Sequence, residues 1–421
     1  MDIKFVRQNP YKVKEGCQKK QIKVDVDKLL MLDEKKRGII KELELLRAEQ
    51  NRISNQVRQE KDENKKNSLI VTSRELGPKI KKLEENLKAI DPEIDKLMRQ
   101  IPNPPFEEVP VGKDDSENQV LRKVKEHTKF DFEPKDHMVL GTDLDLIDTD
   151  RAAKTSGSRF GFLKNEAARM EFALVNFALD ILSKEGFSLV ITPVMLKPEM
   201  MAGMGYTERG VDEIYFLEKD NLYLVGTSEQ MIGPMHADEV FELKELPKRY
   251  VGFSSCFRRE AGSYGKDTKG ILRVHQFDKL EMFSFTHPDK SKEEHELLLS
   301  MEEKLMQKLE IPYQVINICT GDLGDPAAKK YDIEAWIPSQ NRYRETHSTS
   351  NCTDFQTRRL NIRFRQKDGS LEFAHALNGT ALAMGRIIIA ILENYQQKDG
   401  SIVIPKVLQK YMGIKKIVKK K

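Results

Sequence analysis

The sequence predicts an α+β protein in which an N-terminal antiparallel helical hairpin precedes a mixed domain of strands and helices. Two observations support this prediction. Apolar residues recur with heptad spacing from about residue 27 to residue 101. After a proline-rich segment, strand patterns rich in aromatic and apolar residues alternate with amphipathic helical patterns. We therefore expect a first domain over residues 1–110 and a second over residues 111–421.

The composition limits the classes of partner. Charged residues make up 33% of the 421 residues, but the net charge is only +4, so any surface that binds nucleic acid must be a local patch. The four cysteines are far apart and form no Cys-x-x-Cys pair, which argues against structural zinc and disulfides. A reducing, cytoplasmic setting is the expectation. No apolar stretch has the length of a signal-peptide core or a membrane span.

The hairpin is expected to consist of two long helices. Asp27 can cap the first, which continues to about Asp62, and a polar break at Glu63–Ser68 separates it from the second. At ~1.5 Å per residue each helix would be roughly 50 Å long. Pro78 and Pro92 should start or kink the second helix. The apolar heptad positions are Ile39, Leu43, Leu46, Ile53 and Val57 in the first run, and Leu76, Ile80, Leu83, Leu87, Ile90, Ile94, Leu97 and Ile101 in the second.

The charge pattern of the hairpin leaves its role open. Lysines and arginines lie between the apolar positions, but acidic residues are interspersed. A coiled coil for oligomerisation or spacing and an RNA-binding arm both fit this pattern. Residues 101–112 contain four prolines, cannot continue the helix, and are expected to form an interdomain linker.

The centre of the second domain is predicted at residues 257–281. Residues 250–258 and 274–285 are expected to form two strands joined by a glycine-rich, cationic loop. If the strands pair, Arg258, Phe277 and Glu281 can converge on one open face of a sheet. A guanidinium suits a phosphate, a ring suits a base, and a carboxylate suits an ammonium group. This set predicts a site for a nucleotide and an amino acid; the alternative is an ordinary surface hairpin.

Three further segments carry candidate site residues. Thr227 and Glu229 offer a hydroxyl and a carboxylate to an ammonium group, although Thr-x-Glu also caps helices. Glu345 is a candidate Mg²⁺ ligand, with a surface salt bridge as the alternative. Residues 377–386 are expected to open a helix that runs to about Tyr395. Arg386 would lie among aliphatic side chains there and would need an anion, either a buried carboxylate or a substrate phosphate.

These motifs, in this order, resemble a known family. Phe257-Arg258-Arg259-Glu260 and Arg273-Val274-His275-Gln276-Phe277 closely resemble motif 2 of class II aminoacyl-tRNA synthetases, in the form found in seryl-tRNA synthetases. A helix at 165–184 followed by the strand 187–193 resembles motif 1, and residues 377–386 resemble motif 3. The linker and the hairpin are similar to those of the same family, so the resemblance covers nearly the whole chain.

The resemblance implies a fold, an activity and partners. The fold would be a mainly antiparallel class II sheet flanked by helices, in a homodimer whose motif 1 segments meet. The activity would be ATP-dependent, Mg²⁺-assisted conversion of L-serine to seryl-adenylate, followed by transfer to the 3′ end of tRNA(Ser), with tRNA(Sec) as an additional acceptor to test. The hairpin and the motif 2 loop would contact the tRNA. A ligase that charges a carrier protein and a non-catalytic RNA-binding scaffold are the alternatives.

The resemblance also implies roles for individual residues. Arg258 would hold the α-phosphate, Phe277 would stack on adenine, and Arg386 would hold the γ-phosphate, with Arg258, Glu281 and Arg386 as the catalytic set. The expected ATP-binding residues are Arg258, Arg259, Glu260, Val274, Phe277, Glu345, Thr346, His347, Ser348 and Arg386, of which Glu345 and Ser348 would bind Mg²⁺. The expected serine-binding residues are Thr227, Ser228, Glu229, Glu281, Asn378 and Thr380. Ser228, His347 and Thr380 depart from residues common in the family.

Overall fold

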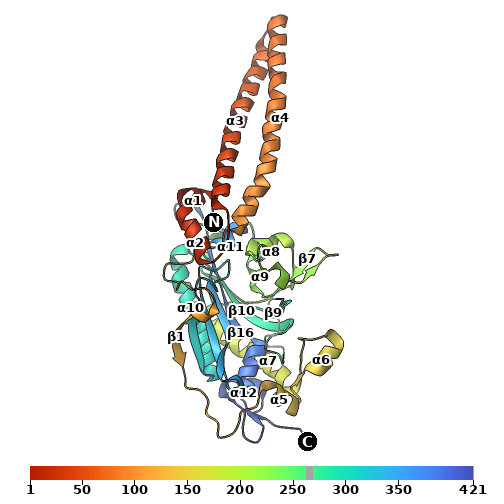
Figure 1. Ribbon diagram of the computed structural model, residues 1–421, viewed down its shortest axis with the longest axis vertical. Helices are drawn as coiled ribbons and strands as arrows, with labels where there is room; N and C mark the ends of the chain where they lie inside the picture. Colours follow the sequence, from red (N-terminus) through yellow and green to blue (C-terminus); the bar gives the residue numbers. More distant parts are fainter. Residues whose placement is uncertain (262–268, 421) are drawn as a thin grey trace. The chain divides into compact units, whose positions relative to one another are not determined.

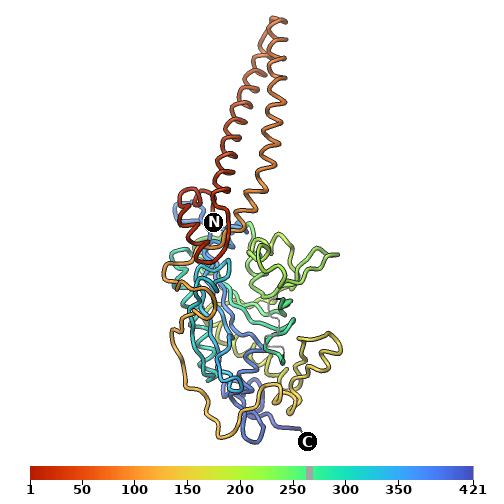
Figure 2. Tube along the Cα trace, in the orientation of Figure 1, coloured from red at the N-terminus to blue at the C-terminus, as the bar shows by residue number. Residues whose placement is uncertain are grey.

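The computed structural model describes residues 1–261 and 269–420 (Figures 1 and 2). It divides into two compact units, one comprising Met1–Pro102 and the other beginning at Asn103. The division lies within the proline-rich segment predicted as a linker. Across the described residues no helix is both long and apolar enough to cross a membrane.

The first unit is a helical hairpin that follows two short helices, α1 (Ile3–Gln8) and α2 (Pro10–Lys19). Helix α3 (Val26–Gln59) has 34 residues and α4 (Glu63–Gln100) has 38. At ~1.5 Å per residue they are about 51 and 57 Å long. They lie side by side along their length (Figure 1). The predicted coiled-coil hairpin is therefore confirmed.

The ends of the hairpin helices differ from the prediction. The N-cap of α3 is Asp25, whose side chain accepts a hydrogen bond from Lys28 N at 2.9 Å, and Asp27 lies inside the helix. Asp62 caps α4, so the turn is confined to residues 60–62 and the expected break at 63–68 is helical. Asp62 provides the backbone amides of the first turn with an acceptor, which allows the second helix to begin earlier than its apolar pattern indicates. Helix α4 continues through Pro78 and Pro92.

The heptad side chains hold α3 and α4 together. Leu43 and Ile53 of α3 form one buried cluster with Leu76 and Ile80 of α4. Ile39, Ile90 and Ile94 belong to a second cluster that includes residues of α1 and α2. Ion pairs flank this seam, among them Arg47–Glu84 and Lys36–Asp91, both at 2.7 Å. The spacing of apolar residues thus determines which faces of the two helices meet.

The second unit contains an eight-stranded sheet with the order β1-β11-β12-β13-β16-β10-β9-β4. Every neighbouring pair is antiparallel except β4 and β9. The mainly antiparallel sheet flanked by helices that the resemblance implies is therefore confirmed. The strands are β1 (Gln119–Val124), β4 (Ser188–Ile191), β9 (Lys248–Phe257), β10 (Gln276–Thr286), β11 (Tyr313–Asn317), β12 (Lys329–Ile337), β13 (Arg342–Asn351) and β16 (His375–Ala383).

Three helices, α7 (Asn165–Leu182), α10 (Ser291–Leu309) and α12 (Met384–Asn394), pack against the sheet and share its main apolar core. On β10, Leu280 and Met282 belong to this core. Lys279 and Glu281 alternate with them along the strand and line a cavity instead. Because successive side chains of β10 point to opposite faces of the sheet, one face of the strand contributes to the core and the other to the candidate site.

One predicted element changes type. Residues 377–383 were expected to open a helix, but they belong to β16, and α12 begins only at Met384. The run is apolar and short, so its pattern fits a buried strand as well as a helix. The segment forms a strand because it pairs with both β10 and β13. Asn378 and Thr380 consequently lie on the sheet, and Arg386 lies in the first turn of the helix that follows it.

The remaining α-helices and strands of the second unit lie outside this sheet, and the strands among them form smaller sheets of two or three strands. They are α5 (His137–Asp143), β2 (Ile147–Asp148), α6 (Thr149–Ser156), β3 (Phe162–Leu163), β5 (Met195–Leu196), α8 (Pro198–Met204), β6 (Phe216–Leu217), β7 (Leu222–Leu224), α9 (Glu229–Ile232), β8 (Val240–Glu242), α11 (Phe355–Arg359), β14 (Arg363–Arg365), β15 (Leu371–Phe373), β17 (Ile402–Val403), α13 (Gln409–Met412) and β18 (Lys416–Ile417).

Candidate active site

A cavity of about 660 Å³ opens on the sheet, and it brings together residues that are far apart in the sequence. Arg258, just beyond the end of β9, and Arg386 from α12 both line it. Both also line a smaller adjoining cavity of about 60 Å³. Two guanidinium groups beside one space can bind two oxyanions of the same ligand.

Arg258 lies just beyond the end of β9, opposite the start of β10. Its Nε and Nη2 each donate to Gly226 O at 3.3 Å. Its guanidinium lies 5.2 Å from the centre of the Phe277 ring. Phe277 lines the small cavity together with Ile271, Leu272 and Val274. A cation beside an apolar slot with an aromatic wall suits a phosphate attached to a planar base.

Arg386 is held against β13. Its Nη1 donates to Glu345 O at 2.9 Å and lies 3.3 Å from the Glu345 carboxylate. The Glu345 side chain is 47% exposed and lines both cavities. Desolvation in the cleft would raise the pKa of Glu345, but the charges of Arg386, Lys330 and Arg258 outweigh it and lower the pKa to about 2. The carboxylate is therefore ionised at neutral pH.

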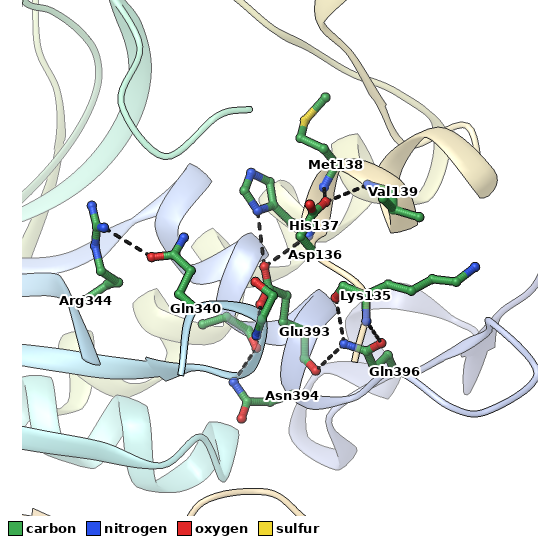
Figure 3. A network of polar contacts seen from close by, with 12 residues as sticks. Lys135, Asp136, His137, Met138, Val139, Gln340, Arg344, Glu393, Asn394 and Gln396 are labelled. Carbon is green, nitrogen blue, oxygen red and sulfur yellow. Dashed lines mark hydrogen bonds and ion pairs between the residues drawn. The ribbon is translucent and has the colours of Figure 1, made fainter. Parts of the chain in front are cut away.

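A polar network anchors the helix that carries Arg386 (Figure 3). Near its far end Glu393 accepts hydrogen bonds from His137 N at 3.0 Å and from Ser339 N at 3.1 Å. Asn394 donates to Trp336 O at 2.8 Å. These contacts join α12 to α5 and to the end of β12, so they fix the direction in which its first turn points.

The inner part of the large cavity is lined by polar side chains from β10 and β16. Glu281 is 1% exposed, lies 2.6 Å from Lys279 Nζ and accepts a hydrogen bond from Thr380 Oγ1 at 3.1 Å. Asn378 Nδ2 points to Cys352 Sγ at 3.7 Å. A buried carboxylate beside a hydroxyl and an amide can bind a small zwitterion that carries a hydroxyl group.

A second carboxylate completes this inner part. Glu229 accepts a hydrogen bond from Tyr206 OH, and Thr227 lies beside it at the start of α9. Glu229 is the first residue of α9 and Thr227 precedes the N-cap Ser228, so the segment begins a helix, as the capping alternative allowed. Burial and the neighbouring charge of Glu281 raise the pKa of Glu229 to about 7. A ligand ammonium group would favour its ionised form.

The family models of the seryl-tRNA synthetase N-terminal domain and of the tRNA synthetase class II core domain (G, H, P, S and T) match residues 1–105 and 215–395. The serine–tRNA ligase of Dictyoglomus thermophilum is 47% identical over 100% of both chains, and that of Rubrobacter xylanophilus is 45% identical over 98% of both. The chain belongs to the seryl-tRNA synthetase family.

Two solved structures of seryl-tRNA synthetases agree with this assignment. The chain resembles the Pyrococcus horikoshii enzyme complexed with ATP, with a TM-score of 0.94 and 43% identity over 100% of both chains. It resembles the cytoplasmic Naegleria fowleri enzyme in complex with AMP with a TM-score of 0.87 and 36% identity, over 98% of this chain and 96% of that one. The fold of a seryl-tRNA synthetase therefore extends over the whole chain.

The other residues expected to bind substrates in this seryl-tRNA synthetase fold divide into two groups. Glu260, Val274, Thr346 and Ser348 line one or both cavities. Three others, Arg259, Ser228 and His347, do not line either cavity.

Each of these three residues has contacts of its own. The exposed Arg259 lies 5.4 Å from the centre of the Tyr215 ring. Ser228 is fully buried and donates to Gly252 O at 3.0 Å. His347 is also fully buried, with Nδ1 2.9 Å from Thr346 Oγ1, and burial lowers its pKa to about 3. It is therefore a neutral residue beneath the site.

Sequence reasoning missed several residues that line the large cavity. Tyr206 and Arg273 come from irregular segments, where no periodic pattern indicates the direction of a side chain. Lys279 could have been found, because it precedes Glu281 by two residues on β10 and therefore shares its face.

The residues available for Mg²⁺ are few but chemically suitable. Over the described ranges, 1–261 and 269–420, no group of three or more His, Cys, Asp or Glu side chains is placed to hold a metal ion. Glu345 and Ser348 nevertheless offer a carboxylate and a hydroxyl oxygen to the large cavity. Mg²⁺ keeps several waters and takes one or two protein oxygens together with substrate phosphates. The donor set therefore fits an ion that arrives with a nucleotide.

Proposed function

We propose that the protein is a serine–tRNA ligase. It activates L-serine with ATP, releases pyrophosphate, and transfers the seryl group from seryl-adenylate to the 3′ end of tRNA(Ser). The observation that carries this proposal is the convergence of Arg258, Arg386 and Glu281 on one cavity in a chain of the seryl-tRNA synthetase family.

ATP binds across the two cavities. The base enters the slot beside Phe277, Arg258 holds the α-phosphate, and Arg386 holds the γ-phosphate. On binding, Arg386 exchanges part of its contact with Glu345 for phosphate oxygens, which form stronger, bidentate hydrogen bonds. When Mg²⁺ is bound, Glu345 and Ser348 would hold it, and it would supply further positive charge to the phosphates. Glu345 is suited to this because its low pKa keeps it ionised.

Serine binds in the inner part of the large cavity. Its ammonium group meets the carboxylates of Glu229 and Glu281, and its hydroxyl is recognised by Thr380 and Asn378. Alanine leaves these buried polar groups unpaired, and a site built to hydrogen-bond a substrate hydroxyl discriminates strongly against an analogue that lacks it. The inner part of the large cavity therefore selects the amino acid, while the small cavity beside Phe277 selects the base of the nucleotide.

The reaction needs no strong base. A serine carboxylate oxygen forms a bond to the α-phosphorus, and the bond from that phosphorus to the bridging oxygen breaks, so that pyrophosphate leaves. The terminal ribose hydroxyl of the tRNA then attacks the seryl carbonyl carbon, the bond from that carbon to the phosphate oxygen breaks, and AMP leaves with its phosphate taking up the hydroxyl proton. Positioning by Arg258 and Arg386 and the neutralisation of charge lower both barriers.

The protein acts as a homodimer. On α7 and β4 the side chains of Phe172, Leu189 and Ile191 are 67%, 52% and 78% exposed. β4 is an edge strand of the sheet. An exposed apolar group at a sheet edge fits contact with a second copy of the chain. These elements are the ones that resemble motif 1.

The tRNA is bound by the helical hairpin and the motif 2 loop. The hairpin offers a long surface with exposed lysines and arginines, which suits a nucleic-acid backbone. Most of the motif 2 loop, residues 262–268, lies outside the described residues. Transfer of the seryl group to tRNA(Sec) is tested by including this tRNA in the charging assay. Free cysteines at all four positions fit a reducing, cytoplasmic compartment.

The proposal is tested by pyrophosphate exchange with each of the common amino acids, followed by charging of purified tRNA. Exchange with serine alone, followed by charging of tRNA(Ser), is the expected result. Exchange with serine without charging of any tRNA would indicate a carrier-protein ligase. The absence of exchange with serine would contradict the proposed activity.

A further inference from the structure

Lys279 lies where the two cavities meet, beside the proposed binding places of ATP and serine. It lines both cavities, is 6% exposed, and its Nζ lies 2.6 Å from Glu281 Oε2. On β10 it stands between Phe277 and Glu281, and alternate residues of a strand share a face. The order along this face is therefore ring, cation and carboxylate.

The ion pair between Lys279 and Glu281 can accept a further ligand. An ammonium group has three N–H donors, and Glu281 is the ion-pair partner of Lys279 within the described part of the chain. Glu281 also accepts from Thr380, and a carboxylate has about four lone-pair sites. Each member of the pair thus keeps hydrogen-bonding capacity on the side that faces the cavity.

The charges of this pair complement those of an α-amino acid. A zwitterion carries an ammonium and a carboxylate a few ångströms apart, and it can lie across the pair so that each charge meets its opposite. The orientation is fixed by the surroundings, because Glu229 adds a second carboxylate beside Glu281 and Arg258 lies in both cavities with Lys279. The ammonium group therefore points to the glutamates and the carboxylate to Lys279.

We propose that Lys279 binds the carboxylate of the substrate serine and directs one of its oxygens at the α-phosphorus held by Arg258. This assignment rests on the proposed function. The carboxylate oxygen forms the new bond to phosphorus while pyrophosphate leaves, and Lys279 transfers no proton. Its positive charge lies beside the attacking oxygen as charge moves onto the phosphate oxygens, so it acts on binding and on the rate of adenylate formation.

A purely structural role for Lys279 predicts something different. If it only held Glu281 in place, its loss would weaken every ligand that uses Glu281, whether or not that ligand has a carboxylate. L-Serinamide separates the two roles, because it keeps the ammonium and hydroxyl groups of serine but replaces the carboxylate by a neutral amide.

The test compares the full-length wild-type chain with Lys279→Met, which keeps most of the side-chain length, and Lys279→Arg, which keeps the charge. Kd values for L-serine and L-serinamide are measured by calorimetry, and adenylate formation by pyrophosphate exchange. We expect Lys279→Met to weaken L-serine by about 10- to 100-fold and L-serinamide by about twofold or less. Lys279→Arg should fold, retain most of the serine affinity, and lower kcat because the longer fork displaces the carboxylate.

Lys308→Met on the exposed side of α10 is the matched control and should change none of these values. Equal losses of serine and serinamide, or full serine affinity in Lys279→Met, would overturn the assignment. If Lys279→Met does not fold, Lys279→Arg decides: a kcat for pyrophosphate exchange equal to that of the wild type, or a clear loss of serine affinity matched by an equal loss of serinamide affinity, would overturn the assignment. A wild-type chain that exchanges no pyrophosphate with serine would instead contradict the proposed function.

Discussion

Arg258, at the end of β9, and Arg386, in the first turn of α12, line the same two cavities although a long stretch of sequence separates them. The sheet explains how they meet, because β10 pairs with β9 on one side and with β16 on the other, and α12 follows β16 directly. A triphosphate placed between them would have a guanidinium at each end. Much of the proposed chemistry depends on this relationship.

The first prediction concerns Arg386. Arg386→Met should lower kcat/KM for ATP in pyrophosphate exchange by about 10²- to 10³-fold, because a charge-assisted contact to the phosphates is lost. Arg386→Lys should recover only part of the loss, since an ammonium cannot bind two oxygens in the same plane. Steady-state exchange with ATP varied is the measurement. Activity of Arg386→Met within a factor of about two of wild type would contradict the role.

The second prediction concerns the pH dependence of serine binding. Burial and the charge of Glu281 raise the pKa of Glu229 to about 7, so Glu229 gains its charge as the pH rises through neutrality. The ammonium group of serine is better bound by the ionised form. The Kd for serine should therefore fall between pH 6 and pH 8. Glu229→Gln should bind serine more weakly at pH 8 and lose this pH dependence; a mutant with the wild-type profile would rule out Glu229 as the titrating group.

The third prediction concerns the hairpin. Lys61 lies in the turn between α3 and α4, and Arg58 and Lys65 lie beside it; all three are exposed. Replacing all three by Glu should leave pyrophosphate exchange unchanged, raise KM for tRNA by about tenfold or more, and reduce the salt dependence of tRNA binding. The control is the same charge reversal at the exposed Lys129, Lys154 and Lys367 of the second unit. An equal effect in both triple mutants would show only that net charge matters.

The fourth prediction concerns a buried acid outside the proposed chemistry. Glu302 of α10 is 0% exposed, and its carboxyl oxygens have no hydrogen-bond partner within the described residues. Burial, together with the charges of Glu281 and Asp332, raises its pKa well above the usual value. The folded state therefore keeps a proton that the unfolded chain releases, and this contribution to stability falls as the pH rises above about 4.5.

Glu302→Gln imitates the protonated acid and should remove this loss. Relative to wild type, its free energy of unfolding should increase with pH by up to about 1.4 kcal/mol per pH unit over pH 5.5–7.5. Chemical denaturation at several pH values measures the difference. Glu293→Gln, at the exposed start of α10, is the control. A difference between Glu302→Gln and wild type that does not change with pH would show that Glu302 is ionised in the folded protein.

The parts of the fold that follow local rules could be predicted from the sequence. Heptad spacing determined the paired faces of α3 and α4. Gly186 ends the segment that follows α7, and its φ of 83° lies in the left-handed region, which glycine adopts without steric cost. The cap of α3 was misplaced because Asp25 and Asp27 are both good cap residues, and only the backbone geometry chooses between them.

The parts that depend on pairing between distant segments could not be predicted in the same way. Residues 377–383 are short and apolar, and their neighbours β10 and β13 decide that they form a strand. Tyr206 reaches Glu229 from an irregular segment without a pattern of its own. The alternation along β10 places Lys279 on the same face as Glu281. Only the folded structure shows that this face lines the two cavities.

The most direct test of the central claim is a crystal structure of the protein with a non-hydrolysable ATP analogue. We predict one analogue molecule with its α-phosphate oxygens within hydrogen-bonding distance of Arg258 and its γ-phosphate oxygens within hydrogen-bonding distance of Arg386. Density that places the triphosphate away from either arginine, or that assigns the two side chains to separate ligands, would contradict the account.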